Sequence, residues 1–321
     1  MLKVFLIGYG ELASSLMLGV LESSHKLVGV LNWEKTQEKF FYSAIKDYFY
    51  PSSINLLTKT YKIPKLNVKS VNSKEFLEQA SKLKPDIILI GAWGEILKKE
   101  IIVLPKIACI NCHPSLLPKH RGSNPYSSVI REDETKTGIS FHLIDENIDS
   151  GPILLQKEIY ISDNDTGGSL KKKCAYKAKE SVKELLDGVK NAKLLPQKQD
   201  KSKMSYFPRI KEEDAKINWN KPSKFIHNQI RALNPWLKCY TRYKNLFLQI
   251  GTSKIIELKN PVYKPGEILA KYNKGFIVST SDTKKALLID DLESFGFVSK
   301  LWSSYFIDKS VKIGDYMEDV G

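Results

Sequence analysis

The sequence has little cysteine and no long apolar run, and these absences exclude several classes of protein. Four cysteines are too few to form a disulfide scaffold in a chain of 321 residues, because disulfide-stabilised domains are short and rich in cysteine. No stretch approaches the roughly 20 consecutive apolar residues of a transmembrane helix. The start of the chain also lacks the basic segment and cleavage site of a secretory signal peptide. We therefore expect a cytoplasmic protein with no membrane partner.

The spacing of the cysteines does not predict a metal site. Cys109 and Cys112 form a CxxC pair, a spacing found in zinc and redox sites, but Cys174 and Cys239 stand alone. A structural zinc ion needs a second pair of ligands at short spacing. Cys109 ends an apolar run, where a small thiol packs well. We expect buried free thiols and no metal.

Basic residues are in excess, and the excess is uneven. The formal net charge is +14, and residues 171–203 contain eleven lysines against four acidic residues, which is +7 of that total. A basic surface attracts polyanions such as nucleic acids. A solvated lysine-rich helix face is the alternative interpretation.

The first half of the sequence alternates apolar strands with amphipathic helices. Strand 3–8, helix 11–21 and strand 27–31 are followed by helix 73–83 and by strands 86–90 and 107–111. This order predicts an α/β fold, with a doubly wound, mostly parallel, Rossmann-like sheet.

A glycine pair follows the first strand. Gly8-Tyr9-Gly10 resembles part of a dinucleotide fingerprint, but Ala13 replaces the third glycine and Asn32 replaces the acidic residue after the second strand. We interpret the pair as a tight turn that lets the helix pack closely.

The pattern of expected strands and helices changes in the second half of the sequence. Strands 137–144 and 152–161 bracket a polar loop, a helix is expected at 168–189, and 193–208 is polar and interrupted by prolines. A helix at 223–232 and six short strands follow, the strands at 238–243, 247–250, 254–258, 266–272, 275–280 and 286–290. Short, evenly spaced strands predict a small OB-like β-barrel. We expect a catalytic domain (1–192), a linker (193–208) and a C-terminal barrel domain (209–321).

The densest chemical cluster follows the strand at 107–111. Ligands of a doubly wound sheet bind at the carboxyl ends of its strands, and Asn111 and His113 lie two residues apart, on one side of an extended chain. Asp149 lies in the later polar loop. The other four histidines, His25, His120, His142 and His227, are interpreted as structural or solvated.

These three residue types suit acyl transfer between nitrogens. An amine that attacks a formyl carbon creates an oxyanion, which needs a donor such as an Asn amide. A histidine can move the protons, and a neighbouring aspartate should raise its pKa and fix its tautomer.

The residues around Asn111, His113 and Asp149 resemble the motifs of a known protein family. Asn111-x-His113-x-Ser115-Leu116-Leu117-Pro118-x-x-Arg121-Gly122, followed by Asp149-Ser150-Gly151, resembles the formyltetrahydrofolate-dependent formyltransferases. The resemblance implies 10-formyltetrahydrofolate as co-substrate, with Asn111 on the formyl oxygen, His113 as proton relay and Asp149 orienting and polarising the site. It also implies a folate site along three segments. The first is Trp93, Gly94, Glu95, Ile96 and Leu97, the second is Ser115, Leu116, Leu117 and Pro118, and the third is Asp145, Glu146, Asn147 and Ile148. Arg121 is implied in the outer wall of the site or on the formyl donor.

Two acceptors are compatible with the resemblance. The segments Tyr206–Arg209, Ile230–Pro235 and Pro265–Leu269 resemble the C-terminal barrel of members that formylate methionyl-tRNA and of related amino-sugar formyltransferases. The overall length, this barrel and the basic excess favour initiator tRNA as the partner. A nucleotide-linked amino sugar is the alternative. It is favoured by aromatic residues in Trp33–Tyr50, where cations are expected for tRNA, and by the unusual Arg121–Tyr126 segment.

Overall fold

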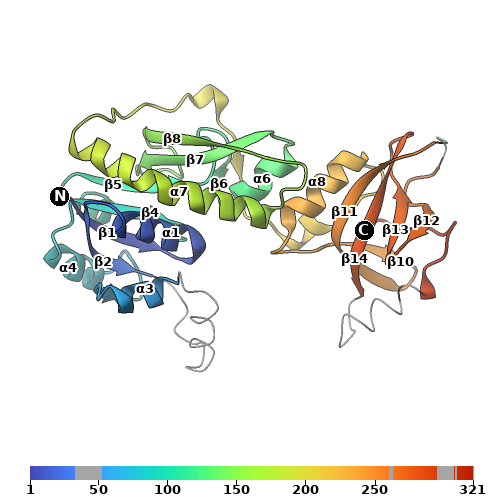
Figure 1. Cartoon of the computed structure of the whole chain (residues 1–321), viewed down its shortest axis with the longest axis horizontal. Helices are drawn as coiled ribbons and strands as arrows, with labels where there is room; N and C mark the ends of the chain where they lie inside the picture. Colours follow the sequence, from blue (N-terminus) through green and yellow to red (C-terminus); the bar gives the residue numbers. More distant parts are fainter. Residues whose placement is uncertain (33–52, 260–262, 295–306, 308, 321) are drawn as a thin grey trace. The chain divides into compact units, whose positions relative to one another are not determined.

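The computed structural model describes residues 1–32, 53–259, 263–294, 307 and 309–320 (Figure 1). These residues form two compact units, each assembled from separate parts of the chain. Unit 1 consists of Met1–Pro125, Lys136–Tyr160 and Leu170–Phe207, and unit 2 consists of Tyr126–Thr135, Ile161–Ser169 and Pro208–Gly321. The segment Trp33–Tyr50, which bears on the choice of acceptor, lies outside the described residues.

Unit 1 is built on a seven-stranded sheet in the order β3-β2-β1-β4-β5-β7-β8 (Figure 1). The first five strands along the chain run parallel, namely β1 (Lys3–Gly8), β2 (Lys26–Leu31), β3 (Lys65–Leu66), β4 (Ile87–Gly91) and β5 (Ala108–His113). β7 (Lys136–Leu143) runs antiparallel to β5, and β8 (Ile153–Tyr160) runs antiparallel to β7. The expected mostly parallel sheet is confirmed, and its buried central strands explain the continuous apolar runs.

Helices cover both faces of this sheet. α4 (Lys74–Lys82) begins at Ser73, whose hydroxyl accepts from the Phe76 amide at 3.1 Å, and Phe76 packs into a core cluster that contains Phe5 and Ile7. α1 (Gly10–Leu21) packs on the other face beside α7 (Gly167–Lys190), at Gly19, where an added Cβ would lie 2.7 Å from the Lys179 carbonyl oxygen. The shorter helices are α3 (Ile54–Thr60), α5 (Lys99–Ile102) and the 3-10 turn η1 (Lys201–Lys203). Among the helices of the described residues, none is long and apolar enough to cross a membrane.

Unit 2 contains a five-stranded antiparallel sheet in the order β10-β11-β14-β13-β12. Its strands are β10 (Cys239–Tyr243), β11 (Leu246–Glu257), β12 (Ile268–Tyr272), β13 (Gly275–Ser279) and β14 (Lys285–Ser294). The C-terminal segment bridges both edges, because Glu318 pairs with Arg242 of β10 and Tyr316 pairs with Glu267 just before β12. The sheet is thereby closed into the expected small barrel.

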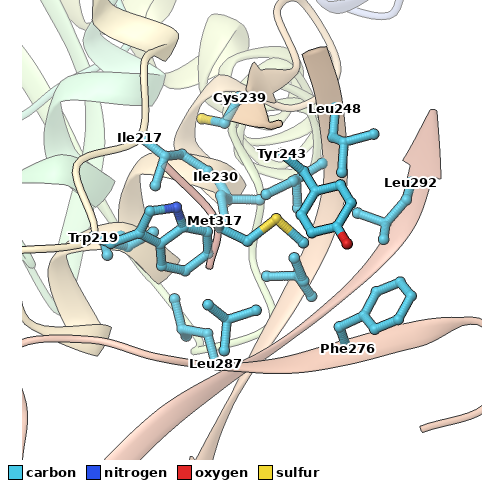
Figure 2. Close-up of a cluster of buried hydrophobic side chains, with 14 of the residues drawn as sticks. Ile217, Trp219, Ile230, Cys239, Tyr243, Leu248, Phe276, Leu287, Leu292 and Met317 are labelled. Atoms are coloured by element: carbon cyan, nitrogen blue, oxygen red, sulfur yellow. The ribbon is translucent and has the colours of Figure 1, made fainter. Parts of the chain in front are cut away.

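The barrel core is dense and includes two large polar-tipped aromatics (Figure 2). Trp219 donates its indole N–H to the Thr241 hydroxyl at 2.9 Å, and the Tyr243 hydroxyl donates to Asp315 at 2.6 Å. Beside the barrel lie α8 (Ser223–Leu233), the 3-10 turn η2 (Glu212–Ala215) and most of α6 (Pro125–Arg131).

The barrel differs from the prediction in one element. The expected strands 247–250 and 254–258 form one continuous strand, β11. Gly251 lies between them and is not itself paired, but the register with β14 is the same on both sides of it. An added Cβ at Gly251 would lie 2.1 Å from an Asp291 carboxylate oxygen. The glycine marks a close approach rather than a chain break.

Candidate active site

The end of β5 brings Asn111 and His113 together. Side chains alternate along a strand, so these two share one face while Cys112 between them is buried on the other. Asn111 Nδ2 lies 3.3 Å from Oδ1 of Asp149, and His113 Nδ1 lies 3.4 Å from the same oxygen. The expected proximity of the three side chains is thus present in the structure.

Asp149 is held in an unusual backbone conformation. Its φ of +51° falls in the left-handed region, which aspartate tolerates better than most residues. The Gly122 amide donates to Oδ2 at 3.0 Å, so both carboxylate oxygens have partners. Burial alone would raise the pKa of this carboxyl group, but attraction to the neighbouring His113 and His142 rings and a hydrogen bond from the Gly122 amide outweigh it and hold the pKa well below its ordinary value. Asp149 is therefore an anion at neutral pH.

His113 is a buried, mainly uncharged imidazole. Burial lowers its pKa, and the neighbouring Asp149 carboxylate, which acts in the opposite direction, does not compensate. As expected, Asp149 acts to raise the pKa of His113, but desolvation by burial is the larger effect and leaves this pKa below its ordinary value.

The tautomer of His113 is set by a different partner from the expected one. Nε2 lies 2.8 Å from the His120 carbonyl oxygen, which can only accept, so Nε2 carries the proton. Nδ1 is then the basic nitrogen, and it faces the Asp149 carboxylate. A proton taken up at Nδ1 would be stabilised there as an ion pair.

His142 also belongs to this site, although the sequence interpretation treated it as structural or solvated. It lies opposite Asn111 in the β5–β7 register, with Nε2 3.1 Å from Asn111 Nδ2 and 3.6 Å from Asp149 Oδ1. Nδ1 is 2.8 Å from the Leu143 carbonyl oxygen, which requires the proton on Nδ1. Nε2 therefore accepts from the Asn111 amide. Strand register, which the sequence does not display, is the signal that would have identified it.

The other three histidines have the structural roles that were expected. His25 accepts from the Leu2 amide at 3.1 Å and pairs with Asp187 at 3.0 Å. His120 stacks on Phe207, with ring centroids 5.1 Å apart, and His227 lies 2.9 Å from the Ser253 hydroxyl.

Gln199 is a second residue that the sequence did not reveal. Its amide nitrogen donates to the carbonyl oxygens of Asp149 and Gly151 at 2.9 and 2.7 Å, which fixes the backbone of the Asp149 loop. Its amide oxygen accepts from Nε and Nη2 of Arg121 at 3.2 and 2.6 Å. The buried Arg121 guanidinium thus supports the backbone of the Asp149 loop through Gln199.

The segment 193–208 therefore does more than connect two domains. Gln197 forms an isolated bridge with Ile153, and β9 (Tyr206–Phe207) pairs with β6 (Arg121–Gly122). An added Cβ at Gly122 would lie 2.2 Å from the Phe207 carbonyl oxygen, so this pairing needs a glycine. The pairing holds Gly122, and with it the amide that binds Asp149.

Comparisons with known proteins agree with this geometry. The family model "Formyl transferase" matches residues 20–186, and the model "Formyl transferase, C-terminal domain" matches residues 209–296. The chain belongs to the formyl transferase family. The family inferred from the Asn111–Gly122 and Asp149–Gly151 motifs is confirmed, and with it the expectation of an enzyme that transfers formyl groups.

Individual relatives of this formyltransferase extend over both units. It is 30% identical to a methionyl-tRNA formyltransferase from Bacillus velezensis over 317 residues, which covers 99% of this chain and 98% of the relative. It is 29% identical to the methionyl-tRNA formyltransferase of Clostridioides difficile, covering 98% and 99% of the two chains. Its fold resembles that of WlaRD, a sugar 3N-formyl transferase crystallised with dTDP and 5-N-formyl-THF, with a TM-score of 0.69, 22% identity and coverage of 93% and 99%.

The loop after β5 is held in this formyltransferase by strand β7 and by a hydrogen bond of its own. The Ser140 hydroxyl donates to the Ser115 carbonyl oxygen at 2.6 Å and accepts from the Leu117 amide at 3.1 Å. The Ser115 hydroxyl donates to the Lys119 carbonyl oxygen at 2.8 Å. Of the four residues expected to line the folate site here, Ser115 and Leu117 are buried and Leu116 and Pro118 are partly exposed.

The loop after β4 presents a mixed surface at the same edge of the sheet. Trp93 and Leu97 pack against the core, whereas Gly94 and Ile96 are exposed, Ile96 to 69%. Glu95 turns away, because its carboxylate accepts from the Ser70 hydroxyl and the Val71 amide.

The loop before Asp149 closes on itself. The Asp145 carboxylate accepts from the Ser150 hydroxyl at 2.6 Å and from the Asn147 amide at 3.2 Å. Glu146, Asn147 and Ile148 are exposed. Each of these two loops has an exposed apolar side chain that a ligand ring could contact, Ile96 in the loop after β4 and Ile148 in the loop before Asp149.

The CxxC pair shows buried thiols. Cys109 and Cys112 lie on opposite faces of β5, and burial raises the pKa of Cys109 to about 12 and that of Cys112 well above its ordinary value. Protonated, buried thiols bind metals poorly. Among the residues that the structure describes, no cluster of three His, Cys, Asp or Glu side chains could hold a metal ion.

Proposed function

We propose that this enzyme transfers the formyl group of 10-formyltetrahydrofolate to the amino group of methionyl-tRNA, with Asn111, His113 and Asp149 as its reacting residues. One observation carries the proposal: a single carboxylate oxygen of the partly buried Asp149 lies within 3.4 Å of both Asn111 Nδ2 and His113 Nδ1. The oxyanion donor, the base and the charge that supports both thus meet at one point.

The chemistry follows from this arrangement. The acceptor amine attacks the formyl carbon, a C–N bond forms, and the formyl oxygen becomes an oxyanion that an Asn111 N–H stabilises. His113 Nδ1 takes the proton that the amine loses, and Asp149 stabilises the resulting imidazolium. As the bond to the folate nitrogen breaks, the same proton passes to that nitrogen and tetrahydrofolate leaves. His113 returns to its neutral form.

Asn111 must exchange a partner during this cycle. In the free enzyme its two N–H groups lie toward His142 Nε2 at 3.1 Å and Asp149 Oδ1 at 3.3 Å. An oxyanion can be bound when the longer of these bonds, to Asp149, is replaced. Asp149 is then free to strengthen its contact with His113 as that ring gains its proton.

The folate is expected to pack against the exposed edges of three loops. Ile96 and Ile148, 69% and 47% exposed, offer apolar surface to a pteridine ring, and partly exposed Leu116 adds to it. Exposed apolar side chains at the carboxyl edge of a parallel sheet are typical of a ligand site. WlaRD, which shares this fold, was crystallised with 5-N-formyl-THF.

Methionyl-tRNA is favoured as the acceptor because both similar methionyl-tRNA formyltransferases match over at least 98% of both chains. A nucleotide-linked amino sugar is the second candidate, on the likeness to WlaRD and on the Asn124-Pro125-Tyr126 segment. The deciding test is formyl transfer from 10-formyltetrahydrofolate to charged initiator tRNA and, in parallel, to a panel of nucleotide amino sugars. Formylation of a sugar but not of the tRNA would overturn the tRNA assignment.

A further inference from the structure

His113 has two neighbouring acceptors that favour opposite tautomers of its ring. The His120 carbonyl oxygen lies 2.8 Å from Nε2, and the Asp149 carboxylate oxygen Oδ1 lies 3.4 Å from Nδ1. A neutral imidazole carries one ring proton, so it can donate to only one of the two. Hydrogen bonds to a carboxylate are ordinarily the stronger ones. The proposed reaction nevertheless needs the carbonyl oxygen to prevail, because only then is Nδ1 free to take a proton from the acceptor amine.

The position of the His120 carbonyl group decides between the two tautomers. While its oxygen faces Nε2, a ring without a proton on Nε2 would set two lone pairs against each other. If this carbonyl group turned away, the ring proton would settle on Nδ1, toward Asp149, and the base on that side of the ring would be lost. The peptide that carries the His120 carbonyl group is therefore part of the proton relay.

His120 has a backbone conformation that needs support. Its φ of +58° lies in the left-handed region, and the residue is 5% exposed. Histidine adopts this region more often than most residues, but any residue other than glycine does so uncommonly. Within the loop, the Ser115 hydroxyl lies 3.4 Å from the His120 carbonyl oxygen, but its shorter bond, at 2.8 Å, goes to the Lys119 carbonyl oxygen. The loop alone thus supports His120 weakly.

Ser205 supplies the missing support from the segment 193–208. Its hydroxyl oxygen accepts from the His120 amide at 2.9 Å, and its carbonyl oxygen accepts from the Arg121 amide at 3.0 Å. Ser205 is therefore bonded to the N–H groups of the two peptide links on either side of His120, and the second link carries the His120 carbonyl group. The Phe207 ring adds to this by stacking on the His120 ring, with the two planes 12° apart.

We propose that Ser205 is a positioning residue of the proton relay, which keeps the His120 carbonyl oxygen on His113 Nε2 and thereby leaves Nδ1 as the base. The proposal rests on the proposed function, because it takes Nδ1 as the nitrogen that receives the proton of the acceptor amine. The segment 193–208 then supports both members of the reacting pair. It acts on His113 through Ser205 and on the Asp149 loop through Gln199.

The tautomer of His113 can be measured by nitrogen-15 NMR on the full-length enzyme without any turnover. The two ring nitrogens have different shifts when protonated and unprotonated, and the signals of His113 are those missing from His113→Ala. The measurement is made well above pH 6.5, the ordinary histidine pKa, so that the ring is neutral. The variants are Ser205→Ala, Ser205→Thr, which keeps the hydroxyl group, and the control Ser202→Ala at an exposed serine of the same segment.

We expect the unmodified enzyme, Ser205→Thr and Ser202→Ala to carry the ring proton on Nε2. In Ser205→Ala part of the population should move to Nδ1, so that the averaged shifts of the two nitrogens approach each other. The groups that act on the charge of His113, namely Asp149, His142 and Arg121, are retained in every variant. A changed tautomer is therefore attributed to the His120 peptide.

Turnover should follow the tautomer. Loss of one neutral hydrogen bond in Ser205→Ala should lower kcat about three- to tenfold. The KM values of the folate and of the acceptor should stay unchanged, because the variant acts on the base. Ser205→Thr should restore kcat. Ser205→Cys, whose sulfur is a weaker acceptor than oxygen, should show the same changes to a smaller extent, and it serves as the test variant if Ser205→Ala does not fold.

The proposal is overturned if the test variant keeps the His113 proton on Nε2, and a lower thermal midpoint and kcat with that tautomer would make Ser205 structural. A moved proton with unchanged kcat would equally overturn it, as would an unmodified enzyme with its proton on Nδ1. If the unmodified enzyme formylates no acceptor, the proposed function fails, while the NMR measurement still decides whether Ser205 sets the tautomer.

Discussion

The side chain of Asn111 is oriented by His142, whose Nε2 lies 3.1 Å from Asn111 Nδ2. His142 holds its own proton on Nδ1, toward the Leu143 carbonyl oxygen, so Nε2 can only accept. This contact fixes which way the Asn111 amide is turned. It places an N–H, rather than the amide oxygen, on the side that faces Asp149.

His142 should therefore act on the reaction through Asn111. We expect His142→Ala to lower kcat about tenfold, the cost of losing one oriented hydrogen bond, with little change in the folate KM. The measurement is steady-state kinetics on the single variants and on the His142→Ala/Asn111→Ala double variant. Once Asn111 is gone, removal of His142 should cost nothing further, and two fully additive losses would refute the positioning role.

Asn111 and His113 should each be needed for turnover. Loss of one oxyanion donor typically costs about 100–1000-fold in rate, so Asn111→Ala should lower kcat by that factor. Loss of the general base in His113→Ala should cost a comparable factor of about 100–10,000. Cys112→Ala is the matched control, because Cys112 lies between them on β5 but is buried on the other face. Near-normal turnover in either site variant would show that the site is wrongly assigned.

The acid side of the rate profile should report His113. Its pKa is lowered by burial, so the neutral base persists below pH 6.5, the ordinary value, and kcat should fall only as pH decreases through the lowered value. Asp149→Asn removes the charge that favours the imidazolium, so this pKa falls further. We expect a loss in kcat of about 100–1000-fold and an acid limb displaced to lower pH. The measurement is the pH dependence of kcat for the unmodified enzyme and for Asp149→Asn. Acid limbs at the same pH in both enzymes would exclude the proposed pairing of Asp149 with His113.

Acid stability gives an independent check on Asp149. A carboxyl group with a lowered pKa in the folded state stabilises the protein above its unfolded pKa, and that contribution is lost as pH falls through the folded value. Asp149→Asn should therefore lose less stability than the parent during acidification. Chemical unfolding at several pH values measures the difference.

Gln199 should maintain the Asp149 loop. Gln199→Ala removes the donors to the Asp149 and Gly151 carbonyl oxygens and leaves the buried Arg121 guanidinium without its amide oxygen partner. We expect a destabilisation of about 1–3 kcal/mol, because buried groups are left unsatisfied, together with a fall in kcat. Gln197→Ala, at an exposed glutamine bonded through its backbone, is the control. Equal effects of the two variants on unfolding and on kcat would contradict this role.

The parts of the molecule that the sequence predicted are local or periodic. The strands of the parallel sheet are continuous apolar runs, and the Asn111-to-Gly122 motif follows one of them directly, so position and chemistry could be inferred together. The side chains of Asn111 and His113 share a face because of strand geometry alone, and the proximity to Asp149 came from the family motif.

The parts that escaped prediction depend on long-range pairing. His142 meets Asn111 only through the β5–β7 register, across the intervening residues 114–135. Gln199 lies in a polar segment without periodicity, and nothing in its neighbours marks it as a support for Asp149. The pKa of His113 likewise depends on how deeply the ring is buried, which no sequence motif specifies.

The acceptor can be distinguished by the salt dependence of its binding. Many phosphates of a bound tRNA would contact lysine and arginine side chains of the enzyme. Each such contact steepens the fall of affinity with salt concentration, so tRNA binding should weaken by orders of magnitude from low to moderate salt. A nucleotide sugar presents one diphosphate and should respond far less. The lysine-rich start of α7, with Lys172 and Lys173 exposed and Lys171 partly exposed, is the surface to test.

Reversal of Lys171, Lys172 and Lys173 to glutamate should weaken tRNA binding and flatten its salt slope, yet leave the kinetics with a sugar acceptor almost unchanged. Lys82, Lys84 and Lys106 provide the control, because they are exposed and lie before β4 and β5, at the amino ends of those strands. Their reversal changes the net charge equally but at the edge opposite to Asn111 and His113. Equal effects of the two triple variants would show that only overall charge matters. If the unmodified enzyme formylates a sugar nucleotide and binds charged tRNA without salt sensitivity, the α7 lysines are a solvated helix face and the tRNA assignment fails.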